Sequence, residues 1–160
     1  VENLGVVGWS ALENAFEGCS NMTSFVAGNT DTSSVTDMRN MFQNCSSLTS
    51  LDVTSFNTTS VSVMRVMFFS CSSLTDVVGV EDFNIEGLNS TTNLNLFATA
   101  VTLPTARYDS LLINWDAQNP FDGMSPNFGN SKYTAGGAAA AARANLISTN
   151  GWTITDGGTA

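Results

Sequence analysis

The fold is decided by the stretch Asn44-Cys45-Ser46-Ser47-Leu48-Thr49-Ser50-Leu51-Asp52-Val53, because nearly the same residue types recur before and after it at a fixed distance. The equivalent cysteines, Cys19, Cys45 and Cys71, are equally spaced, and each follows a phenylalanine by three positions. A fixed period of this length is the signature of a repeat protein, in which each unit buries its apolar face only against its neighbours. The sequence therefore predicts a solenoid of 26-residue repeats.

Two apolar patterns follow one another within a repeat. Leu48, Leu51 and Val53 form the pattern L-x-x-L-x-L, which is typical of a short strand with one buried face. After a Ser/Thr/Asn-rich loop, a second set occupies one stripe of a helix of about three turns, namely Val61, Met64, Met67, Phe68 and Cys71. The predicted fold class is an α/β repeat solenoid, with leucine-rich-repeat-like coils of short strand plus helix and an α/β C-terminal cap.

The third repeat departs from this template. The step from Phe68 to Phe97 is longer than the step from Phe42 to Phe68, which predicts three inserted residues, with Ala100 in the place of the cysteine. Insertions into repeat arrays fall in loops on one face, so residues 80–92 are expected to bulge outward.

Beyond Pro104 the period is lost. An apolar stripe on Tyr108, Leu111, Leu112 and Trp115 predicts a helix, and residues 138–147 predict an alanine-rich helix closed by Asn150-Gly151. Short strands are expected to end near Tyr133 and to cover residues 152–155. A repeat array exposes an apolar end unless an atypical unit covers it. We therefore predict two parts: a repeat array in residues 1–103, beginning in an incomplete repeat of a longer protein, and a capping segment in residues 104–160.

Charge and composition exclude several functions. The net charge of −9, with five cations, disfavours binding to nucleic acid and to anionic membranes. No apolar run is long enough to cross a bilayer. Histidine is missing, which removes the commonest general base and most zinc sites. Nothing in the sequence places two of the later carboxylates, Asp109, Asp116 and Asp122, across a cleft from each other, as a glycosidase needs. We predict no catalysis and no cofactor.

The cysteines could form disulfides or bind metal, and several carboxylates could bind calcium. The odd number and parallel stacking of the cysteines argue against disulfides and metal binding and favour buried, reduced thiols. Six carboxylates could offer oxygen ligands to calcium, but the sequence contains no loop with the calcium-binding spacing of acidic residues. These six are Asp31, Asp52, Asp76, Glu81, Asp82 and Glu86.

The repeats resemble a known family. The units C-S-S-L-T-S-L-D-V-T-S-F-N-T-T-S-V and V-T-D-M-R-N-M-F-Q-N-C look like the BspA-type leucine-rich repeats of bacterial surface proteins, over residues 9 to about 103. The end of the chain, with Tyr108-Asp109-Ser110-Leu111-Leu112 and Gly151-Trp152-Thr153-Ile154-Thr155, is similar to the segment that closes such arrays. The resemblance implies a secreted or surface-anchored bacterial protein, or a structural component of a bacteriophage, and it carries no catalytic residues.

Two sets of residues are candidates for binding. Side chains on the outer face of the short strands form a narrow polar strip, made of Ser24, Val26, Ser50, Asp52, Asp76 and Val78. The inserted segment adds Glu81, Asp82 and Glu86. We expect a non-catalytic extracellular or cell-surface module for recognition or adhesion, which binds protein or glycan on a cell surface and belongs to a larger protein or a multimeric display. The alternative is a virion component, a bacteriophage decoration or tail-fibre segment that acts as a rigid spacer or docking platform.

Overall fold

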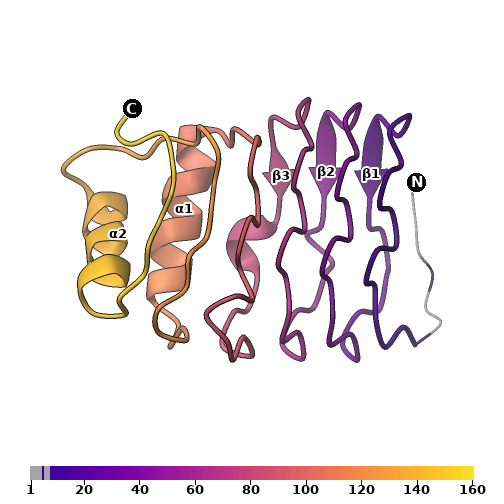
Figure 1. The fold of residues 1–160 in the computed structure, drawn as a ribbon, viewed down its shortest axis with the longest axis horizontal. Helices are drawn as coiled ribbons and strands as arrows, with labels where there is room; N and C mark the ends of the chain where they lie inside the picture. Colours follow the sequence, from indigo (N-terminus) through magenta and orange to yellow (C-terminus); the bar gives the residue numbers. More distant parts are fainter. Residues whose placement is uncertain (1–4, 6–7) are drawn as a thin grey trace.

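The computed structural model describes residue 5 and residues 8–160. Its strands lie side by side in a parallel sheet of order β1-β2-β3, and two α-helices lie beyond β3, at the end of the molecule away from β1 (Figure 1). The elements are β1 (Ser24–Val26), β2 (Ser50–Asp52), β3 (Val77–Val78), the 3-10 helix η1 (Val80–Asp82), α1 (Thr105–Asp116) and α2 (Ala138–Ser148).

The strands keep the register of the sequence repeat. Ser24 pairs with Ser50 and Phe25 with Leu51, so paired residues occupy equivalent positions in successive repeats. Leu51 pairs in turn with Val77. All three apolar side chains in this row are buried, because the L-x-x-L-x-L pattern places every second strand residue on the inner face. The predicted strands are confirmed, although each is only two or three residues long.

The predicted fold class, an α/β repeat solenoid with a helix in every coil, is wrong. Among the described residues there are only three short parallel strands and two α-helices, and both α-helices follow the repeats. Residues 35–45 and 61–71, for which the apolar stripe predicts helices, contain no helix. Turns cover residues 39–44 and 65–70, and an isolated bridge joins Asp37 to Val63 just before them.

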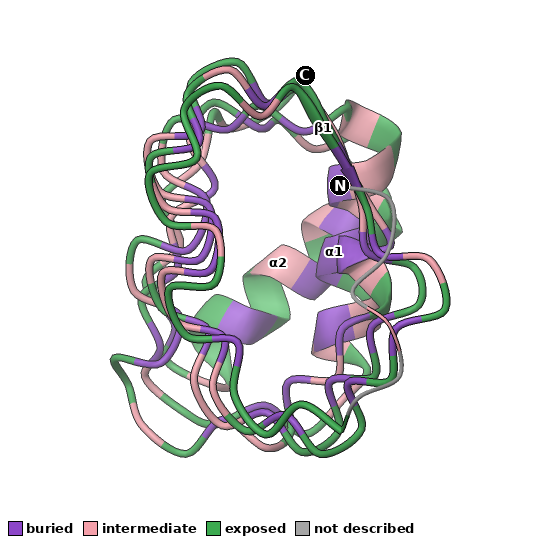
Figure 2. Cartoon of the chain, turned by 90° about the vertical axis from the view of Figure 1, so that its right-hand side faces the viewer, coloured by how far each residue is buried: buried purple, intermediate pink, exposed green. Residues whose placement is uncertain are grey.

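The turns form because the backbone hydrogen bonds of these segments run between repeats. The amides of Met38, Asn40 and Phe42 donate to carbonyls of the next repeat, for example Phe42 N to Met67 O at 2.9 Å. An α-helix would instead direct each amide to the residue four positions earlier in its own segment. The apolar side chains are still buried, as the buried segments in Figure 2 indicate, so the same spacing serves a different backbone.

Residues with positive φ recur every four positions within these turns. Each repeat carries two of them, and they are Asn14 with Gly18, Asn40 with Asn44, Val66 with Ser70, and Leu96 with Ala100. Asparagine and glycine tolerate this left-handed conformation better than other residues. The left-handed positions interrupt any continuous helix, which is the physical reason for the failed helix prediction.

The insertion in the third repeat contains four residues, so the expected three is wrong. The amide of Phe42 donates to the carbonyl of Met67, and the amide of Phe68 donates to the carbonyl of Phe97. The separation between donor and acceptor along the chain is four residues longer in the second pair. The positive-φ residues agree, because the step from Val66 to Leu96 is also four positions longer than the step from Asn40 to Val66. Phe97 therefore occupies the place of Met67, and Val101, not Ala100, takes the place of the cysteine. Val101 is fully buried, as that place requires.

The core runs without a break from the repeats into the C-terminal segment. Phe42 stacks between Phe16 and Phe68 at ring-centroid distances of 5.3 and 5.8 Å. Phe68 contacts Phe97, whose ring lies 5.7 Å from that of Trp115 in α1. The expected register is confirmed for Phe16, Phe42 and Phe68, but not for Phe97, which the sequence pattern matches to Phe68.

The C-terminal segment contains the two helices that the sequence predicts. Helix α1 buries Tyr108, Leu111, Leu112 and Trp115, which are the residues of the predicted stripe. Asp156, nearly buried, accepts hydrogen bonds from Tyr108 Oη at 2.7 Å and from Arg143 Nε at 2.8 Å, so it ties the end of the chain to both helices. The short strands expected near Tyr133 and in residues 152–155 are reduced to isolated bridges at Tyr133 and Thr155.

The division at residue 103 stays a prediction, and the predicted incomplete repeat of residues 1–9 falls largely outside the described residues.

Candidate functional site

The outer face of the three strands brings the first candidate set together. Ser24 and Ser50 are adjacent and exposed, and Val26, 43% exposed, lies beside Asp52. Asp52 in turn lies beside Val78. Each repeat thus places one or two small side chains on a continuous outward-facing strip, which we call the strand face and which comprises Ser24, Val26, Ser50, Asp52, Asp76 and Val78.

Asp52 is occupied by its own turn. Its Oδ1 accepts hydrogen bonds from the amide of Thr54 at 3.0 Å and from the hydroxyl of Thr54 at 2.8 Å. An aspartate that binds the backbone two residues ahead stabilises a turn. Asp52 therefore shapes the exit of β2 and offers mainly its second carboxylate oxygen to a ligand.

Asp76 is linked to the inserted segment through a residue that sequence reasoning missed. Arg107, from α1, binds both Asp76 and Glu81, and its Nη2 donates to Asp76 Oδ2 at 3.1 Å. The hydrogen bonds to Asp76 and Glu81 raise the pKa of the Arg107 guanidinium. This ion-pair cluster sets one positive charge against two of the candidate carboxylates, so it stays net negative, and it fixes α1 beside β3.

The inserted segment does not bulge outward as a free rim. Its Phe83, Ile85 and Leu88 are buried, and Gln118 next to α1 binds its backbone twice, from Nε2 to Phe83 O at 3.0 Å and from Ile85 N to Oε1 at 2.7 Å. The expectation failed because the apolar residues within the insertion supply an inner face. Only some of its side chains, including Asp82 and Glu86, remain exposed.

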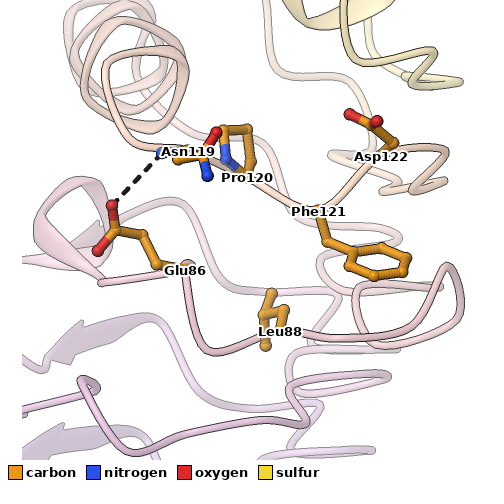
Figure 3. Close-up of a pocket in the computed structure, with 6 residues that line it drawn as sticks. All are labelled: Glu86, Leu88, Asn119, Pro120, Phe121 and Asp122. Atoms are coloured by element: carbon orange, nitrogen blue, oxygen red, sulfur yellow. Dashed lines mark hydrogen bonds between the residues drawn. The ribbon is translucent and has the colours of Figure 1, made fainter.

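An open pocket of about 400 Å³ lies where the inserted segment meets the loop after α1. Figure 3 shows Glu86 and Asp122 on opposite sides of the group of lining residues, and the side chains of Leu88 and Phe121 below both carboxylates. The remaining lining residues are Asn119 and Pro120. Glu86 is a predicted site residue of the insertion and Asp122 is not, and nothing in their spacing indicates that they line one pocket.

The backbone around this pocket is held in place from the end of the chain. Trp152 Nε1 donates to Phe121 O at 2.9 Å, and Gly123 N donates to Asn150 O at 2.7 Å. The carboxylate of Asp122 accepts from Asn150 Nδ2 at 3.1 Å. The pocket is therefore a built feature of the fold, with walls from two segments that lie far apart in the sequence.

The cysteines are free, as expected, but only two of the three are buried. Cys45 and Cys71 donate through Sγ to the carbonyls of Phe16 and Phe42 in the preceding repeat, at 3.1 and 3.0 Å. Cys19 is exposed, so the prediction of three buried thiols is wrong at the first repeat. The preceding repeat covers both buried thiols, since each donates to one of its carbonyls.

The calcium hypothesis gains no support from the arrangement of the acidic side chains. Within residues 5 and 8–160, no group of three or more acidic or sulfur side chains could hold a metal ion.

No helix of the described chain is long and apolar enough to cross a membrane.

A known family model matches most of the chain. The family described as "Mycoplasma protein of unknown function, DUF285" matches residues 10–136. No curated protein and no solved structure matches the chain.

Proposed function

The chain belongs to the DUF285 family, and on that premise we propose that it is a non-catalytic recognition or adhesion module displayed on a surface. The match covers the repeats and α1, so it concerns the part of the chain that carries the strand face. A family of repeat proteins of this kind is compatible with a role at a cell surface.

The observation that carries the proposal is the register of the strand face. Ser24 with Ser50 and Val26 with Asp52 place short side chains in fixed rows one strand spacing apart, on the side of the sheet opposite the core. Such a surface repeats the same small contact along its length. It suits recognition of an extended partner, protein or glycan, better than it suits chemistry on a small substrate.

The finer relationship rests on resemblance. The spacing Val-x-x-Met-x-x-Met-Phe-x-x-Cys resembles that of BspA-type repeat proteins of bacterial surfaces. We propose on this ground an extracellular or cell-surface location, a cell-surface protein or glycan as partner, and display as part of a larger protein or in many copies. We propose in addition that residues 104–160 cap the apolar end of the repeats, since Trp115 and Phe128 lie against Phe97.

The experiment compares two double variants in a multivalent format. Val26→Lys with Ser50→Lys places two long charged side chains on the strand face and leaves the Asp52 turn intact. Ser46→Lys with Ser72→Lys adds the same charge at two exposed turn positions off the strands. Each protein is coupled in many copies to beads and tested on a printed glycan array and on cultured epithelial cells.

We expect beads that carry the unmodified protein to bind. Beads that carry the strand-face variant should lose most of that binding, and beads that carry the control variant should keep it. An equal loss of bead binding in both variants would mean that the added charge weakens binding wherever it is placed. The strand face would then no longer be the proposed binding site. No binding by the unmodified beads to any of these surfaces would contradict adhesion, and the spacer role in a virion would then be tested in its place.

A further inference from the structure

We infer that the pocket between the inserted segment and the loop after α1, lined by Glu86, Leu88, Asn119, Pro120, Phe121 and Asp122, binds a lysine or arginine side chain of a protein partner. The inference deepens the proposed function and rests on it, because it names a site and a chemistry that the strand face does not supply.

The apolar part of the pocket fits the stem of a long basic side chain. Phe121 is 40% exposed although it is a large aromatic residue, while Leu88 beside it is buried. Figure 3 shows both side chains in the same group of lining residues as the two carboxylates, below them in that view. Lysine and arginine place their methylene groups on such surfaces and keep the charged end in a polar environment, and an aromatic face adds attraction for the cation.

The carboxylates of the pocket have no cation from the described part of this chain. Glu86 accepts hydrogen bonds from neutral groups, the amide of Asn119 and the side chain of Asn84, both at 3.4 Å, and Asp122 accepts from Asn150. Three of the five cations form ion pairs elsewhere, and no ion pair within residues 5 and 8–160 involves Glu86 or Asp122. The pocket therefore combines two negative charges that lack an ion-pair partner in the described chain with an apolar surface, and a cationic ligand would complement both.

The end of α1 adds to the same potential. The helix ends at Asp116, three residues before Asn119, and its last turn contains no basic residue. The C-terminus of a helix carries a partial negative charge, which favours a nearby cation. With a net charge of −9, the whole molecule attracts basic partners over a longer range. Charge complementarity therefore selects a basic side chain over a neutral or acidic one.

The test is an NMR titration of the full chain with short peptides. The probe is acetyl-Gly-Ser-Lys-Ser-Gly-amide, and the matched peptide carries norleucine in place of lysine, which keeps the stem and removes the charge. We expect the lysine peptide to shift the amide signals of Leu88, Phe121 and Gly123, and the norleucine peptide to bind clearly more weakly. Raising the ionic strength from about 0.01 M to about 1 M shortens the Debye length from about 30 Å to about 3 Å and should weaken only the lysine peptide.

Single variants locate the binding site. Glu86→Gln and Asp122→Asn should each weaken the lysine peptide about two- to fivefold, the range for one exposed charge pair. Glu17→Gln removes the same charge from an exposed position in the first repeat and should leave the affinity unchanged. Phe121→Ala should weaken both peptides, and it spares the hydrogen bond from Trp152, which uses the Phe121 backbone carbonyl.

Several results would overturn the inference. They are equal binding of the two peptides, shifts that map to another surface, or a response of Glu86→Gln and Asp122→Asn no larger than that of Glu17→Gln. Lactose is titrated in parallel. If lactose shifts these signals and the lysine peptide does not, the pocket binds a glycan and not a basic side chain.

The bead assay separates this inference from the proposed function. Beads that adhere equally with and without Glu86→Gln leave adhesion standing and remove the pocket. If the pocket binds the lysine peptide but the beads adhere to no surface, the pocket stands and the proposed adhesion is contradicted.

Discussion

Replacing Val66 by asparagine should stabilise the protein, although the change puts a polar residue in the middle of the repeats. Val66 has a φ of 62°, a left-handed conformation that a β-branched side chain strongly disfavours. The equivalent residues of the two preceding repeats are Asn14 and Asn40, and the side chain of Asn40 donates from Nδ2 to Oδ1 of Asn14 at 2.8 Å. An asparagine at position 66 would suit the backbone and extend this pair of side chains to a third repeat.

The expected gain is worked from two contributions. The left-handed conformation costs an ordinary residue roughly 1–2 kcal/mol, and asparagine recovers part of it. One added hydrogen bond contributes about 0.5–1.5 kcal/mol. Val66 is half-buried, so the lost apolar contact offsets part of both. We expect a net increase of about 1 kcal/mol in the free energy of unfolding, and for a chain of this length a rise of about 2–4 °C in Tm.

The assay is equilibrium unfolding in urea, followed by circular dichroism, with a parallel thermal scan. Val66→Gly relieves the backbone without adding a side-chain bond and should gain less than Val66→Asn, because glycine loses more conformational freedom on folding. Val63→Asn is the matched control, since Val63 is also half-buried, lies three residues earlier, and has no positive φ. A loss of stability in Val66→Asn as large as that in Val63→Asn would refute the assignment of left-handed positions.

Three further predictions concern the core, the thiols and the end of the repeats. Phe42→Ala should cost about 3–5 kcal/mol in urea unfolding, because Phe42 is fully buried between two stacked rings; a cost under about 1 kcal/mol would contradict that packing. A maleimide at pH 8 should label Cys19 in the native protein, whereas Cys45 and Cys71 should react only after unfolding, since burial raises their pKa to about 11 and about 12; rapid native labelling of three thiols, counted by mass spectrometry, would be inconsistent with this. Deleting residues 104–160 should uncover the apolar end of the repeats and cause association in light scattering, and a monomeric, cooperatively folding truncation would mean that the segment is no cap.

Some of the fold could be predicted from sequence because the signals are local and periodic. The strand pattern around Leu51 specifies one buried face, and the stripe of Tyr108, Leu111, Leu112 and Trp115 specifies α1. The spacing of Cys45 and Cys71 sets the register that the sheet keeps.

The turns could not be distinguished from helices by apolar spacing alone. Met38, Met41, Phe42 and Cys45 fit one stripe of a helix and equally fit a series of turns that buries every third or fourth residue. The signal that separates the two is Asn or Gly at four-residue intervals, at Asn14, Gly18, Asn40 and Asn44, but it is lost at Val66. Matching Phe97 to Phe68 by residue type predicts an insertion of three residues, whereas the backbone hydrogen bonds match Phe97 to Met67.

The site was only partly predictable, since the strand face follows from strand alternation and the pocket does not. Arg107 reaches back along the chain to Asp76, and Asp122 meets the inserted segment only because Trp152 and Asn150 hold its loop. Contacts between non-repeating segments leave no periodic trace in a single sequence.

The central claim, weak recognition strengthened by display in many copies, is tested most directly by comparing affinities. The strand face has short side chains and little aromatic surface, so one copy lacks the groups that make strong binding contacts. Linked copies convert later binding steps into intramolecular ones. The monomer and a tetramer on a rigid scaffold are titrated by surface plasmon resonance against the same immobilised cell-surface extract or glycan. We predict about micromolar or weaker binding by the monomer, and at least about a hundredfold tighter binding by the tetramer. Nanomolar binding by the monomer, or no gain in the tetramer, would contradict the claim.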